Sequence, residues 1–142
     1  MTPTELGNSS KRFYVTSYVP YYDRDGETKL NKDLANIAGD AEFIMHLGNI
    51  QDSTFMCPST RYSDVASILC KSPVTIFVLP GEEDWTKCPN PDKALVHWLD
   101  AFVGFESHFK HPFEIYRHRE SPEDFAMVHN GVLFFGLHLV NG

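Results

Sequence analysis

The sequence has little of several features that mark whole classes of proteins. There are three cysteines and no Cys-x-x-Cys pair, which excludes a disulfide-dense scaffold and argues against a structural zinc site. Lys and Arg number 12 against 19 Asp and Glu, and the net charge is −7. We therefore expect no binding to nucleic acids or to anionic membranes. No apolar run approaches the roughly 20 residues that a membrane-spanning helix needs.

Two further absences concern targeting and catalysis. The N-terminal residues lack the apolar stretch of a secretory signal peptide, so a soluble protein without a signal peptide is expected and its compartment stays open. The sequence holds no Gly-rich phosphate loop, no HExxH motif and no Gly-x-Ser-x-Gly elbow. The common enzyme motifs that can be recognised from one short segment are therefore missing.

The remaining composition is that of a folded protein. The 142 residues are 42% hydrophobic and 13% aromatic, enough for one domain with a single core. We expect residues 1–12 to form a flexible polar N-terminal arm and residues 13–142 to form the domain. Cys70 is the last residue of an apolar helical pattern, and we expect its thiol to be buried.

Hydrophobic periodicity predicts an α/β fold. Runs rich in β-branched and aromatic residues predict strands, and apolar stripes with helical spacing predict helices. The predicted strands cover 12–19, 41–47, 73–80, 113–118, 124–130 and 132–140, and the predicted helices cover 29–38, 61–71 and 90–105. Their order is β-α-β-α-β-α-β-β-β, which predicts a parallel sheet from the first three strands. Asn130 and Gly131 predict a tight hairpin turn.

The loops that follow the first three strands should meet at one edge of this sheet, where α/β proteins bind ligands. His46 ends the second strand and is a candidate general acid or base. A histidine at such a position more often makes hydrogen bonds to a loop backbone, and we favour this interpretation.

These loops also resemble a known family, the calcineurin-like metallophosphoesterases. The segment FIMHLGNIQD resembles the second metal-ligand block of that family, and TIFVLPGEEDW resembles the third. FYVTSYVPYY and NGVLFFGLHLVNG resemble the first block and a later strand of one subgroup. The similarity runs from about Phe13 to the last residue. The resemblance implies half of a metallophosphoesterase-like αββα sandwich, hence a partial domain, and phosphoester hydrolysis with a divalent metal.

The chain departs from the family pattern where the metal ligands should be. Tyr18 stands at the first Asp position, Asn49 stands at the bridging Asp, and Glu83 most nearly takes the Asn position of the third block. The family's further ligands are histidines of a C-terminal half that this sequence does not include. Two metal ions need bridging and charged ligands to offset their repulsion, so the resemblance implies a degenerate and truncated domain without efficient activity by itself.

In the alternative interpretation the chain is an active metal-dependent enzyme. Five oxygen-bearing side chains on neighbouring loops are candidate ligands for a rebuilt site that holds one hard divalent ion such as Mg, Mn, Ca or Fe. They are Asn49, Asp52, Glu82, Glu83 and Asp84. Such a site would support a metal-dependent phosphomonoesterase or phosphodiesterase. The simpler interpretation is a solvated acidic loop without a metal, and we favour it.

Two more expectations concern covalent and intermolecular contacts. The resembled subgroup has cysteines near the positions of Cys57 and Cys88, which implies a disulfide between two crevice loops, whereas two reduced thiols are equally compatible with the sequence. The apolar strand 132–140 would lie at or near a sheet edge, and an uncovered edge invites pairing with another chain. We therefore expect a homo-oligomer through this strand or a poorly soluble chain, unless the strand is internal to the sheet.

Overall fold

The computed structural model describes residues 12–21 and 24–140. Within them the predicted order of strands and helices is confirmed. The strands are β1 (Arg12–Thr16), β2 (Ala41–His46), β3 (Thr75–Val78), β4 (Glu114–Arg117), β5 (Phe125–His129) and β6 (Val132–Gly136). The helices are α1 (Arg24–Ala35), α2 (Ser59–Leu69) and α3 (Pro91–Phe102), with 3-10 turns at Ser53–Phe55, Glu82–Asp84 and Phe105–His108. Most of the predicted N-terminal arm lies outside the described residues.

The first three strands form the predicted parallel sheet. Its order is β1-β2-β3, with β2 in the centre. Side chains alternate along β2, so Phe43 and Met45 join one apolar cluster while Ile44 joins another on the opposite face. Both faces of this sheet are therefore covered, as its continuous apolar strands predict.

Several element ends differ from the prediction: α1 begins at Arg24 rather than at residue 29, and β6 ends at Gly136 rather than at residue 140. The first strand ends at Thr16 rather than at residue 19, because Tyr18 has a φ of 57° and begins a turn. Helix α1 ends at Ala35, and the side-chain amide of Asn36 donates to the carbonyl oxygen of Lys32 at 2.8 Å. Asn side chains that bond the local backbone in this way compete with helix continuation.

The other two helices follow the sequence pattern closely. The buried residues of α2 are Tyr62, Val65, Ile68 and Leu69, the stripe that the spacing predicts. Helix α3 begins at Pro91, and the Asn90 side chain accepts from the backbone N–H of Lys93 at 3.2 Å, which caps the first turn. Cys70 follows α2, and its thiol is exposed; the expectation of a buried thiol is wrong because the residue lies on the outer side of the helix end.

The last three strands form a separate antiparallel sheet in the order β4-β5-β6. Asn130 and Gly131 have φ values of 50° and 77°, and His129 pairs with Val132 across them. Positive φ at both central residues is the geometry of a type I′ turn. The predicted hairpin is confirmed.

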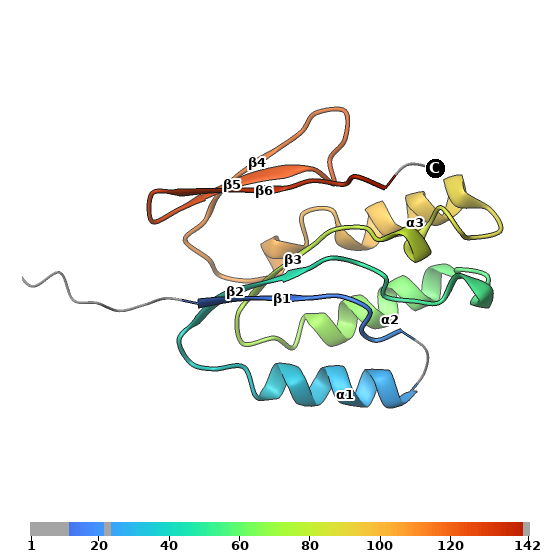
Figure 1. The fold of residues 1–142 in the computed structure, drawn as a ribbon, viewed down its shortest axis with the longest axis horizontal. Helices are drawn as coiled ribbons and strands as arrows, with labels where there is room; N and C mark the ends of the chain where they lie inside the picture. Colours follow the sequence, from blue (N-terminus) through green and yellow to red (C-terminus); the bar gives the residue numbers. More distant parts are fainter. Residues whose placement is uncertain (1–11, 22–23, 141–142) are drawn as a thin grey trace, which may run out of the picture.

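The elements stack in layers (Figure 1). One apolar cluster joins the three helices to the parallel sheet through residues such as Leu34, Tyr62 and Trp98. The second cluster lies between the two sheets and contains Phe43, Phe77 and Phe125 among others. The protein is thus mixed α/β with two small sheets. Among the described residues, no helix has both the length and the apolar character needed to cross a membrane.

Candidate functional site

The loops after β1, β2 and β3 meet at the carboxyl end of the parallel sheet, as predicted. The backbone N–H of Tyr18 donates to the carbonyl oxygen of Gly48 at 3.1 Å, which links the first two loops. The second and third loops are joined by more bonds, described next. We call residues 48–53 and 81–85 together the loop cluster.

Asp84 is the centre of the loop cluster. Its carboxylate accepts hydrogen bonds from the backbone N–H groups of Asn49 (2.8 Å), Ile50 (2.7 Å) and Gly81 (2.8 Å). The side chain is fully buried. Each carboxylate oxygen is therefore already engaged by at least one backbone donor, and Asp84 joins the two loops rather than facing solvent.

Burial has a second effect on Asp84. Desolvation raises the pKa of this carboxyl group to about 6, although the three backbone N–H donors oppose the shift. The Tyr62 hydroxyl lies beside it, donating to the carbonyl oxygen of Asp84 at 2.7 Å and accepting from the Gln51 side-chain amide at 2.7 Å. Burial also raises the pKa of the Tyr62 phenol, so this hydroxyl stays protonated and acts as a donor at neutral pH.

Asn49 and Glu83 form a second set of bonds between the same loops. The Asn49 side-chain oxygen accepts from the backbone N–H of Glu83 at 2.9 Å. The Glu83 carboxylate accepts from the hydroxyl (2.5 Å) and the backbone N–H (3.2 Å) of Ser53, and it pairs with Lys87 at 3.0 Å. These contacts, the Ser53 hydroxyl foremost, lower the pKa of Glu83. Both side chains thus act as structural links.

The two loops also touch through glycines. Gly48 has a φ of 80°, and a Cβ built there would collide with the backbone nitrogen of Gly81. A Cβ built on Gly81 would in turn collide with the side chain and backbone of Asn49. The approach is so close that only glycine fits at these two positions.

His46 makes the backbone contacts that the sequence analysis favoured. Its Nδ1 accepts from the N–H of Gly48 at 3.1 Å, so the ring proton lies on Nε2, which donates to the carbonyl oxygen of Val19 at 2.7 Å. The ring is fully buried, and desolvation lowers its pKa to about 4. At neutral pH His46 is an uncharged link between the first two loops.

The remaining candidates are not brought into this centre. The Tyr18 side chain is 58% exposed and lies next to the ring of Tyr21. Asp52 accepts from the N–H of Thr54 at 2.9 Å and caps the short turn that follows it. Glu82 is exposed and pairs with Lys87 at 3.3 Å.

The donor atoms do not fit a metal centre. Among the described residues, no group of three or more His, Cys, Asp and Glu side chains lies in a position to hold a metal ion. The carboxylate oxygen atoms of Asp84 and Glu83 in the loop cluster already accept hydrogen bonds from N–H, O–H and ammonium donors. A metal ion would have to displace these donors before it could be bound.

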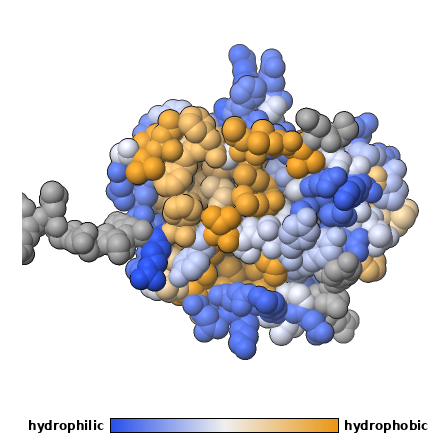
Figure 2. Space-filling view, viewed as in Figure 1, coloured by the Kyte–Doolittle hydropathy of each residue, from blue (hydrophilic) through white to orange (hydrophobic). Residues whose placement is uncertain are grey.

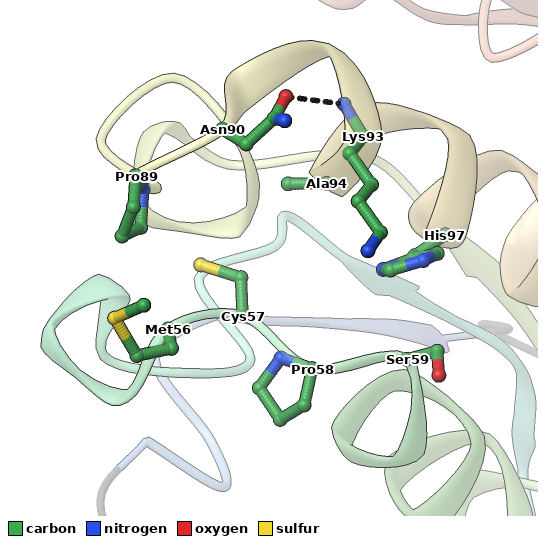
Figure 3. A pocket seen from close by; sticks show the side chains of 9 residues that line it. All are labelled: Met56, Cys57, Pro58, Ser59, Pro89, Asn90, Lys93, Ala94 and His97. Carbon is green, nitrogen blue, oxygen red and sulfur yellow. Dashed lines mark hydrogen bonds between the residues drawn. The ribbon is translucent and has the colours of Figure 1, made fainter.

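Cys57 and Cys88 form a disulfide, the first of the two alternatives that the sequence left open. It ties the end of the loop after β2 to the segment before α3. A cavity of about 410 Å³ lies beside it, lined by residues of both segments and of α3. Figure 3 shows Lys93 and His97 of α3 on one side of this cavity and Ser59 on the other. The cavity is distinct from the loop cluster.

One set of polar contacts was not predicted. The indole N–H of Trp85 donates to Nε2 of His138 at 3.1 Å, and Nδ1 of His138 lies 3.1 Å from the Glu123 carboxylate. Because Nε2 accepts, Nδ1 carries the proton and donates to Glu123. The segment after β6 is thereby attached to the loop after β3. No local pattern indicates a contact between residues 53 positions apart, so the sequence offered no signal for it.

Comparisons with protein-family models, with curated proteins and with solved structures find no match to this chain.

Proposed function

We propose that this chain is a non-catalytic domain with a metallophosphoesterase-like fold, in which the former metal-ligand loops serve to hold the structure together. The proposal combines the sequence resemblance with one structural observation. That observation is the buried Asp84 carboxylate, which accepts three backbone N–H bonds from the two loops.

The chemistry of the donors supports this proposal. Activation of water by a divalent ion needs ligands whose lone pairs are free to bind that ion. In the loop cluster, Asn49 and Asp84 accept N–H bonds from the loops themselves, and Glu83 is neutralised by Lys87. The resemblance places Asn49 and Glu83 at ligand positions, but here the side chain of each makes a hydrogen bond from one loop to the other.

The test is metal binding measured together with turnover. We expect the purified chain, incubated with Mn²⁺ and dialysed, to retain no stoichiometric metal by elemental analysis. We also expect no thermal stabilisation by Mn²⁺ and no hydrolysis of p-nitrophenyl phosphate above the buffer rate.

The opposite result is equally definite. Stoichiometric metal and turnover that are abolished by Glu83→Ala, but kept in the matched Asp64→Ala variant, would overturn the proposal. Asp64 is an exposed acid on α2, so it controls for the loss of a negative charge. That outcome would establish the alternative, a metal-dependent phosphoesterase with a rebuilt acidic site.

A further inference from the structure

The two sheets end on the same side of the molecule in two stacked strands. Within the described residues, β1 pairs only with β2, and β6 pairs only with β5. The ring of Phe13 on β1 lies 5.6 Å from that of Phe134 on β6, measured between centroids. The free edges of β1 and β6 therefore lie one above the other. We call this pair of strands the open edge.

The open edge carries apolar side chains in place of the features that usually protect strand edges. Phe13 and Val15 on β1 are 48% and 56% exposed, and Leu133 and Phe135 on β6 are 53% and 63% exposed. Figure 2, drawn in the same orientation as Figure 1, shows a broad apolar surface on this side. Residues 132–137 contain no charged residue and no proline, although charges and prolines are the common means of blocking edge pairing.

We propose that a second copy of this chain covers the open edge, with β1 and β6 each pairing antiparallel to its own counterpart across one twofold axis. Each free edge needs a strand as its partner because it presents unpaired backbone N–H and C=O groups. A single extended peptide would cover one of the two edges. A second copy presents both edges with the same separation between sheets, so one axis along the sheet normal satisfies both.

The distribution of charge is compatible with a second copy at this place. The chain has a net charge of −7, so self-association through most of its surface meets repulsion. The charged residue of β1 is Arg12, which is already paired with Asp40 at 2.9 Å. The open edge is thus a part of the surface where two copies could meet without bringing like charges together.

The pairing predicts which residues face each other. If the whole of β6 pairs, the strand centre at Phe134 lies on the axis, and Leu133 of one copy is opposite Phe135 of the other. Both side chains are exposed on the outer face of the sheet, so substitutions there leave the internal core intact.

The experiment is size-exclusion chromatography with light scattering on the full chain over a range of concentrations. We expect a dimer for the unmodified chain. The variant Leu133→Lys/Phe135→Lys places lysine opposite lysine twice, and we expect its dissociation constant to rise by about tenfold or more. The variant Leu133→Lys/Phe135→Glu places lysine opposite glutamate, and we expect it to recover most of the dimer.

Two further variants keep the test decisive. Val15→Lys places the new charge on β1, and we expect it to weaken the dimer even if the β6 variants do not fold. Val96→Lys, on the exposed side of α3, is the matched control and should leave the dimer unchanged. A monomer at every concentration, a dimer insensitive to both strand variants, or a ladder of larger oligomers would each overturn the proposal.

Discussion

The loop cluster and the open edge differ in which groups they bury and which they leave exposed. In the loop cluster, the polar groups of Asp84 and Asn49 are buried and paired within the chain, as is the neighbouring ring of His46. At the open edge, apolar side chains and strand backbone remain exposed. In the region whose sequence resembles an active site, the polar groups are thus already hydrogen-bonded within the chain. The strands of the open edge leave apolar side chains and backbone groups exposed. The sequence resemblance concerns the first region, whereas the exposed apolar side chains lie at the second.

The strongest test of this contrast removes the disulfide that ties together the segments following the loop cluster. We expect Cys57→Ser/Cys88→Ser to lower the free energy of unfolding by about 4 kcal/mol, because the disulfide closes a loop across a sequence separation of 31 residues. Urea denaturation measures the change. Cys70→Ser, at the exposed free thiol, is the control. Equal stability of the two variants would show that the disulfide does not hold the loops.

The next test concerns the buried carboxylate. We expect Asp84→Asn to lower the free energy of unfolding by about 3 kcal/mol, since the amide group would point an N–H at a backbone N–H donor that Asp84 now satisfies. Thermal and urea denaturation check this value. Asp64→Asn on the exposed side of α2 should change stability by less than about 0.5 kcal/mol. A loss for Asp84→Asn no larger than that of this control would remove Asp84 as the anchor of the cluster.

The third test uses pH. Burial lowers the pKa of His46 from 6.5 to about 4, so between these values the unfolded chain binds a proton that the folded chain does not. Stability from this residue is therefore complete above pH 6.5 and is lost as the pH falls toward 4. The loss reaches roughly 2 kcal/mol near pH 5.

His46→Gln isolates this effect because glutamine does not titrate. We expect the variant to be less stable than the unmodified chain at neutral pH and the gap to narrow as the pH falls. Urea denaturation at several pH values measures the gap. The carboxyl group of Asp84 shifts in the opposite direction but is present in both proteins, so it cancels in the difference. A gap that stays constant with pH would contradict a buried, neutral His46.

The smallest effect is expected on the apolar surface near the open edge. Leu139 is 80% exposed, so Leu139→Ser should change the free energy of unfolding by less than about 0.5 kcal/mol. The same denaturation assay, run at a concentration where the chain is monomeric, measures it. A large loss would mean that this leucine packs against the fold, and the contrast between the two regions would weaken.

Much of the fold was predictable because it depends on local patterns. The α2 stripe, the proline at the start of α3 and the Asn-Gly hairpin each follow from residue types at short spacing. The meeting of three loops at one sheet edge follows from parallel strands alone. The ends of β1 and α1 were missed since single residues, Tyr18 and Asn36, end them through a positive φ and a side-chain bond.

The use of the site residues was less predictable. The sequence shows that Asp84 and Glu83 are carboxylates, and this alone is compatible with metal ligands or with structural anchors. The choice depends on which backbone N–H groups lie free nearby, and that depends on the path of two loops separated by more than 30 residues. His46 was better predicted because a buried histidine at a strand end has few partners other than backbone.

The contact between Gly48 and Gly81 bears on how this chain could change over evolutionary time. A catalytic centre needs volume for its ions and substrate, but these two backbones approach so closely that even one methyl group does not fit. Asn49→Asp would therefore supply a negative charge but no volume for a metal ion. A metal centre at this place would require the loops to separate first, which would break the hydrogen bonds to Asp84. Any sequence change that opened these loops for a metal ion would therefore first lower the stability of the fold.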